Sequence, residues 1–161
     1  MKRFESPLAF AEHLLVIRHE IHKHTERGLE KALVLIETDA KEQIGHYQEA
    51  AGPHPAWAPL AESTEAEKAR LGYPTDAPLL RTGELQDSFG HEAHGNEGVV
   101  GSTDKTMVYH EMGTEKMPPR PALGPAVFKN REKIEQILGR ALVEGIVEGA
   151  IVGGLGLADT E

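Results

Sequence analysis

The sequence predicts an α+β protein with an N-terminal helix, a small antiparallel sheet and a long C-terminal helix. Apolar residues recur every three or four positions over much of residues 8–44 and again over residues 127–142, which is the period of an amphipathic helix. Between these segments, two short runs at residues 88–93 and 98–102 are separated by a stretch rich in glycine and asparagine. Such a stretch is typical of a hairpin, so the two runs are expected to pair as strands.

The N-terminal helix is expected to begin at Ser6 and Pro7, since serine caps helices and proline is tolerated at the first helical position. Two apolar stripes follow. The first comprises Leu8, Ala11, Leu14, Leu15 and Ile21, and the second comprises Leu29, Ala32, Leu33, Ile36, Ala40 and Ile44. Gly28 lies between the stripes, where it can bend or break the helix, and Gly45 is the expected stop.

The middle of the chain alternates loops with short elements. Residues 51–59, which hold three prolines and the single tryptophan, predict an extended loop. Thr64 and Glu67 offer a capping box for a short helix that ends near Gly72. Thr82 can cap a single helical turn through Leu85. Residues 107–111 fit either a third strand or a short helical turn.

The last long helix is expected to open at Pro125, with an apolar stripe formed by Val127, Ile134, Ile137, Leu138, Ala141 and Leu142. Residues 1–144 are predicted to form one domain, and residues 145–161 a glycine-rich, apolar C-terminal extension. Glycines in this extension recur every four residues with Ile and Val between them. It fits a flexible terminus or a segment that packs on a neighbouring subunit, mobile over residues 145–158 until it docks.

Composition and charge exclude several classes of protein function. Seventeen Lys and Arg stand against 26 Asp and Glu, a formal net charge of −9, which lacks the footprint of a nucleic-acid-binding protein. The absence of cysteine excludes disulfides and thiolate chemistry. Neither a secretory signal nor an apolar run long enough to span a membrane is visible, so a soluble protein made in the cytoplasm is expected.

No catalytic or metal-binding motif has the context it requires. The sequences His-Glu-Ile-His at residues 19–22 and His-Glu-Ala-His at residues 91–94 each fall one residue short of a zinc-protease motif. Ser88 and His91 lie close in sequence but lack a nucleophile elbow. We therefore expect no enzyme activity, no cofactor and no metal, with a histidine-dependent metal hydrolase as the alternative from another class.

A series of blocks, taken in order, is more specific than any of these motifs. The blocks are WAPLAESTEAEK, APLLRTGELQDSF, EGVVGSTDKTMVYHEMGTEK and MPPRPALGPAV. This order resembles the virion morphogenesis and tail completion proteins of Mu-like and lambdoid tailed phages over residues 57–128. The resemblance rests on Trp57, Pro59, Leu60, Thr64, Leu79, Thr82, Gly83, Leu85, Ser88, Val100, Gly101, Tyr109, His110, Gly113, Pro119, Arg120, Pro121 and Leu123. Ala122 departs from it, because the families usually carry phenylalanine there, and so does the glycine-rich tail.

The resemblance implies a non-enzymatic neck or tail-end subunit that completes the tail and joins it to the head of the virion. Such subunits form a ring, commonly of six copies, around the DNA channel. The implied partners are further copies of the chain, the tail terminator or tail tube protein, and the connector below the portal, with DNA passing through unread. A tail terminator is the alternative within the same class. The residues expected to define the fold or the interfaces are Trp57, Thr82, Gly83, Leu85, Ser88, Tyr109, Gly113, Arg120 and Pro121.

Overall fold

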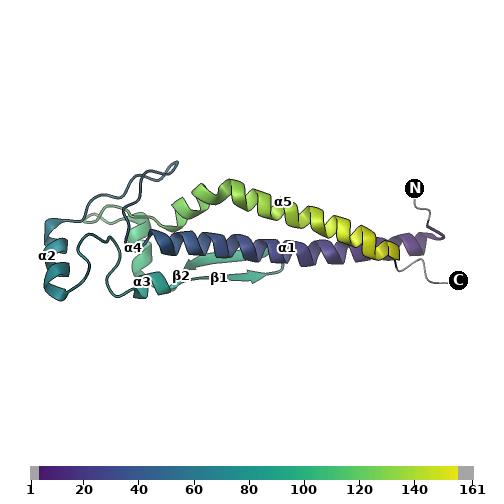
Figure 1. Ribbon diagram of the computed structural model, residues 1–161, viewed down its shortest axis with the longest axis horizontal. Coiled ribbons are helices and arrows are strands. Elements are labelled where there is room, and N and C mark those ends of the chain that lie inside the picture. Colours follow the sequence, from purple (N-terminus) through teal and green to yellow (C-terminus); the bar gives the residue numbers. More distant parts are fainter. Residues whose placement is uncertain (1–3, 156–161) are drawn as a thin grey trace. The chain divides into compact units, whose positions relative to one another are not determined.

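A computed structural model describes residues 4–155 of the chain and confirms the α+β class (Figure 1). The elements, in order, are α1 (Pro7–Gln43), α2 (Glu62–Leu71), α3 (Glu84–Asp87), β1 (Phe89–His94), β2 (Glu97–Ser102), α4 (Thr106–Met112) and α5 (Leu123–Leu155). The two strands form one antiparallel hairpin, joined by a turn at Gly95 and Asn96. Gly95 takes a φ of 60°, which suits the first position of a tight hairpin turn.

The described residues divide into two compact units. We call residues 33–92 and 99–132 the core unit, and residues 4–32, 93–98 and 133–155 the helix-pair unit. Helices α1 and α5 each contribute to both, so the division falls within elements and not at the predicted residue 144.

The core unit holds nearly all the buried large side chains. The C-terminal part of α1 supplies part of this core, as its second stripe predicts, and the loops, β1, α4 and the start of α5 supply the rest. The buried apolar residues are Leu33, Ile36, Ala40, Ile44, Ala51, Trp57, Ala77, Pro78, Phe89, Met107, Ala122 and Ala126. Ala122, which stands where the resemblance would lead one to expect a phenylalanine, is fully buried.

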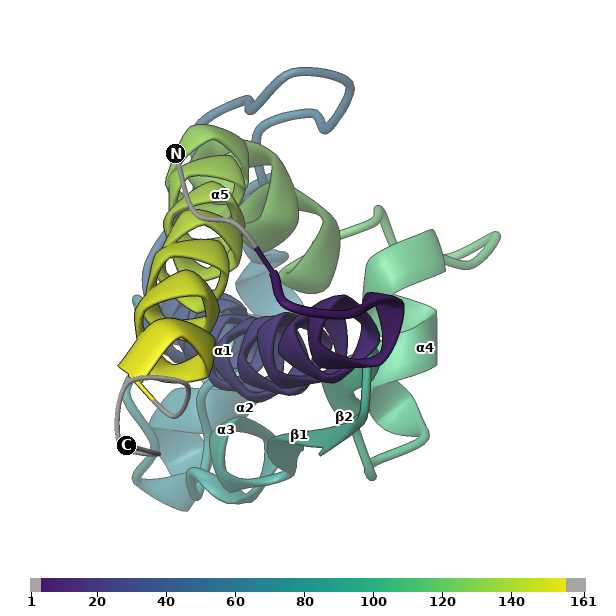
Figure 2. The same ribbon diagram turned by 90° about the vertical axis from the view of Figure 1, so that its right-hand side faces the viewer.

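The helix-pair unit is built on the N-terminal part of α1 and the C-terminal part of α5, which lie side by side in both views (Figure 1, Figure 2). Their contact is made by small residues. A Cβ built on Gly145 would lie 2.7 Å from Ile21 Cα, and one on Gly149 would lie 2.6 Å from Ile17 Cα. Only glycine allows two helix backbones to approach this closely.

Helix α1 shows the predicted start but not the expected break. Ser6 Oγ accepts a hydrogen bond from the backbone N–H of Ala9 at 3.1 Å, which is an N-cap contact. The helix then continues without interruption through Gly28. A Cβ on Gly28 would lie 2.6 Å from Cβ of Ala141, so this glycine serves the approach of α5 and does not end the helix.

The short helices correct two further expectations. Helix α2 begins at Glu62, two residues before Thr64, and no side chain caps it. Its predicted end is confirmed, because Gly72 takes a left-handed φ of 79°. Residues 107–111, for which strand and helix were both open, lie in α4, whose start is fixed by Asp104 Oδ1 accepting hydrogen bonds from Thr106.

Helix α5 begins at Leu123, two residues before the expected Pro125, and runs to Leu155. The prediction that the glycine-rich segment stays mobile is therefore wrong for residues 145–155, which are helical. Gly145, Gly149 and Gly153 lie against α1 of the same chain. Residues 156–158 of that prediction lie outside the described residues.

Candidate functional site

Hydrogen bonds from Trp57 and Arg120 connect two proline-rich segments of the core unit, around residues 57–59 and residues 120–121. The indole N–H of Trp57 donates to the carbonyl of Pro121 at 3.1 Å. In return, the Arg120 guanidinium donates through Nε and Nη2 to the carbonyl of Ala58, at 3.2 and 3.0 Å, and through Nη2 to that of Pro59 at 3.0 Å. Arg120 and Pro121 are buried, so these bonds lie away from competing water. The Arg120 side chain is thus held by backbone carbonyls of the core unit.

The segment around residues 120–121 leads directly into α5. The backbone N–H of Arg120 donates to the carbonyl of His110 at 2.7 Å. Glu111 Oε1 accepts from the N–H groups of Ala122 and Leu123 at 2.8 and 2.7 Å, where α5 begins. A carboxylate in this position satisfies free amide groups and complements the helix dipole. Helix α4 and the start of α5 are thus held to one another.

Thr82, Gly83, Ser88 and Gly113 flank the short helices α3 and α4, while Leu85 and Tyr109 lie within them. Gly83 has a φ of 96° and is the N-cap of α3, while Thr82 Oγ1 accepts from the Glu84 N–H at 3.4 Å. Gly113 ends α4 with a φ of 73°, and a Cβ there would lie 3.0 Å from Pro119. The Ser88 hydroxyl donates to the Leu85 carbonyl at 2.6 Å.

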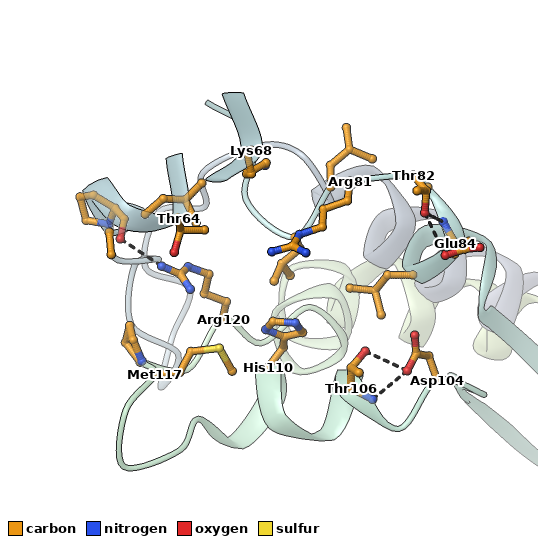
Figure 3. A pocket seen from close by; sticks show the side chains of 18 of the residues that line it. Thr64, Lys68, Arg81, Thr82, Glu84, Asp104, Thr106, His110, Met117 and Arg120 are labelled. Atoms are coloured by element: carbon orange, nitrogen blue, oxygen red, sulfur yellow. Dashed lines mark hydrogen bonds between the residues drawn. The ribbon is translucent and has the colours of Figure 1, made fainter. Parts of the chain in front are cut away.

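These segments surround a hollow of about 560 Å³ in the core unit, shown in Figure 3. Of the residues singled out from the sequence, Thr82, Gly83, Leu85 and Arg120 line it. Trp57, Ser88, Gly113 and Pro121 do not line it, and neither does Tyr109, which is more than half exposed.

Sequence reasoning missed three basic side chains of this hollow, Lys68, Arg81 and Lys116, because they lie far apart in the chain. Lys68 is buried and donates to the carbonyl of Ala77. Burial lowers the pKa of the Lys68 ammonium, and the nearby Arg81 lowers it further. His110, named only as a matching position, also lines the hollow. Burial lowers the pKa of its imidazole, with a smaller contribution from Arg120, so the neutral form is favoured.

The helix-pair unit carries a second notable surface, which is apolar. Small residues of α5, namely Ala141, Gly145 and Gly149, are buried, whereas the large residues beside them are exposed. Val143, Val147 and Ile151 follow one another at intervals of four and are 58%, 51% and 56% exposed. The other large apolar residues exposed in this unit are Leu8, Phe10, Leu14, Leu15, Leu138, Leu142, Ile146 and Val152.

A polar cluster also joins the two helices of this unit. His24 Nε2 and Glu148 Oε2 lie 2.7 Å apart, and Lys23 Nζ lies 2.7 Å from Glu20 Oε2 and 3.8 Å from Glu148 Oε1. The hydrogen bond from Lys23 is the largest cause that lowers the pKa of Glu20. Ligand atoms of Glu20, His24 and Glu148 lie close enough to hold a metal ion, yet the Lys23 ammonium already provides a cation there.

The histidine pairs that resemble zinc motifs are arranged differently. Among the described residues, neither His19 nor His22 belongs to a group that could hold a metal. His22 pairs with Glu26 at 3.3 Å, and His91 Nδ1 is hydrogen-bonded to Glu37. His91 and His94 both lie on β1, three residues apart, so they point to opposite faces of the hairpin.

No protein-family model, curated protein or solved structure matches the chain. Within residues 4–155, no helix is long and apolar enough to cross a membrane.

Proposed function

We propose that this chain is a structural subunit of a tailed-phage virion, which completes the head-proximal end of the tail and joins it to the head without catalysis. The observation that carries the proposal is the helix-pair unit, which buries glycine and alanine and exposes valine, isoleucine and leucine. Large exposed apolar side chains that recur along one helix ridge, as Val143, Val147 and Ile151 do, are typical of a protein that is completed by association. The order of the blocks from Trp57 to Phe128 supplies the virion context.

Other copies of the chain are the partners that fit this surface best. Each copy presents an apolar ridge on α5, formed by Val143, Val147 and Ile151, together with Leu8, Leu14 and Leu15 on α1. A neighbour that places the same helices against this surface buries large side chains on both sides. Fully burying an exposed side chain of this size contributes about 1.5–3 kcal/mol, and these side chains, which are already partly buried, gain a part of that. Several of them outweigh the repulsion between acidic subunits once salt screens it. A ring of six copies around the DNA is the arrangement that the resemblance implies.

Deletion of the gene from the phage that encodes this chain tests the virion role. The expected lysate contains DNA-filled heads and separate tails, because joining is lost while packaging is not. Labelled protein supplied to that lysate should restore infectivity and locate at the neck. Empty heads, or intact infectious particles that lack the protein, would contradict the proposal.

A matched pair of variants tests the surface. Val147→Glu places a charge on the α5 ridge of the helix-pair unit and should abolish rescue of the deletion lysate. Leu71→Glu adds the same charge at an exposed leucine of α2 in the core unit and should rescue like the unchanged protein. Equal rescue by both would show that the ridge is not an assembly surface.

A further inference from the structure

The hollow in the core unit is basic, although the chain is acidic. Four cationic side chains line it: Lys68, Arg81, Lys116 and Arg120. The acidic lining residues are Glu84 and Asp104, so the four cations outnumber the two carboxylates. Asp104 accepts two hydrogen bonds from Thr106, and Glu84 accepts one from Thr82 at 3.0 Å. In a chain with nine more acidic than basic residues, this concentration of cations points to a bound anion.

Arg120 is held in place before any ligand arrives. Its Nε and Nη2 atoms donate to the carbonyls of Ala58 and Pro59, and Nη1 makes none of these bonds. The side chain is buried, so it has already lost the rotamer freedom that binding normally restricts. A carboxylate can add a charge-assisted hydrogen bond at Nη1 without displacing the bonds that fix the group.

His110 supplies a second sign of a missing partner. Its Nδ1 atom is buried and has no hydrogen-bond partner among the described residues, and the residue contributes to the lining of the hollow. Buried polar atoms in proteins are nearly always satisfied, and an exception calls for an explanation. Figure 3 shows His110 turned towards the same hollow as Arg81. A carboxylate oxygen that enters this hollow can accept a hydrogen bond from the Nδ1–H tautomer.

The apolar part of the lining indicates what carries the carboxylate. Leu60, Leu79, Leu80, Leu85 and Met117 contribute to the walls, together with Pro59 and Pro118. A small inorganic anion would leave these side chains without contacts. The side chain of a glutamate or aspartate within a peptide brings apolar neighbours along with the charge. A nucleic acid is disfavoured, because the net charge of −9 repels a polyanion and the cations surround a hollow instead of forming a stripe.

We propose that this pocket binds an acidic side chain of an extended peptide segment from a partner protein, with Arg120 and Arg81 meeting the carboxylate and the leucines contacting the flanking residues. The proposal does not rest on the virion role. A pocket that fails to bind leaves the apolar surface of the other unit unaffected, and the reverse also holds.

Titration of the full-length, isotope-labelled protein with two capped tripeptides, Leu-Glu-Leu and Leu-Gln-Leu, tests the proposal by NMR. The glutamate peptide should shift the His110 ring and Arg120 side-chain signals, and should bind about tenfold more tightly than the glutamine peptide, as expected for loss of one charge-assisted contact. No shift at millimolar peptide, or equal affinity for both peptides, would overturn the proposal.

Two variants with the same charge change locate the site. Arg81→Gln should weaken binding of the glutamate peptide about tenfold, since it removes a cation from the pocket. Its fold is expected to survive, because the Arg81 side chain is 50% exposed and its ion pair with Glu67, at 3.5 Å, lies at the surface. Arg70→Gln changes an exposed residue of the same region that does not line the hollow, and should leave binding unchanged.

These measurements distinguish a peptide bound in the pocket from non-specific binding to the surface and from binding of another kind of anion. Equal weakening by Arg70→Gln and Arg81→Gln would mean that the whole surface attracts the peptide and would overturn the pocket. Inorganic phosphate or a short oligonucleotide that binds more tightly than the glutamate peptide, at the same His110 signal, would overturn the peptide as occupant. Restoration of affinity by Arg81→Lys would support a charge at this position as the requirement.

Discussion

The core unit and the helix-pair unit bury different things, although α1 and α5 belong to both. The core unit encloses Trp57, Phe89, Met107 and, from α1, Leu33 and Ile36, in the manner of an ordinary globular domain. The helix-pair unit, within the described residues, buries no side chain larger than alanine except Glu20. A single helix can therefore bury its large apolar side chains along one stretch and expose them to solvent along the next.

Removal of a large core side chain should have the largest effect. Trp57→Ala is expected to lower the free energy of unfolding by about 3–5 kcal/mol, because it empties a buried site and leaves the carbonyl of Pro121 without its donor. Denaturant unfolding measures the change. Tyr109→Ala, which alters a side chain that is 57% exposed, is the control and should change stability by roughly 0.5 kcal/mol or less. Similar losses from both variants would remove the distinction between a closed core and its surface.

In the helix-pair unit, the stability of the protein should depend on side chains that are added, and not on large side chains that are removed. Gly149→Ala adds a Cβ 2.6 Å from Ile17 Cα and should destabilise the protein by about 1–3 kcal/mol. Gly139→Ala, in the same helix, meets nothing within 4 Å and should stabilise it by about 0.5–1 kcal/mol through helix propensity. Thermal unfolding of the pair measures both signs. Stabilisation by both would show that the helices do not approach closely.

The part of the fold that sequence predicted well is the part where periodicity and burial coincide. The second stripe of α1 includes Leu33, Ile36, Ala40 and Ile44, and all four are buried. The first stripe predicted helix correctly, but Leu8, Leu14 and Leu15 are exposed. Amphipathic spacing shows which residues seek an apolar contact, and it does not show whether the chain itself provides that contact.

The glycines and the basic pocket were harder to foresee for different reasons. Gly28 is compatible with a helix break or with close packing, and only the position of Ala141 across the pair decides between them. The pocket depends on Lys68, Arg81, Lys116 and Arg120, which no sequence spacing connects. Arg120 is one of the positions on which the resemblance rests, but its carbonyl partners come from residues 58 and 59, far away in sequence.

A smaller effect concerns pH in the core unit. Hydrogen bonds from Lys41 and then from His91 lower the pKa of the Glu37 carboxyl below its ordinary value. The charged form is therefore stabilised in the folded state, and this contribution is present above the ordinary pKa and lost as the pH falls through the lowered one. Glu37→Gln should be less stable than the unchanged protein at pH 7, with the difference vanishing in strong acid. Unfolding curves over that pH range measure it, and a difference independent of pH would contradict the assignment.

We propose that other copies of the chain complete the helix-pair unit. Sedimentation of the full-length protein at physiological salt tests this association. The unchanged protein should associate as its concentration rises, Val147→Glu should remain monomeric, and Leu71→Glu should associate like the unchanged protein. A protein that stays monomeric over the whole micromolar range, or one whose association Val147→Glu leaves intact, would contradict the claim.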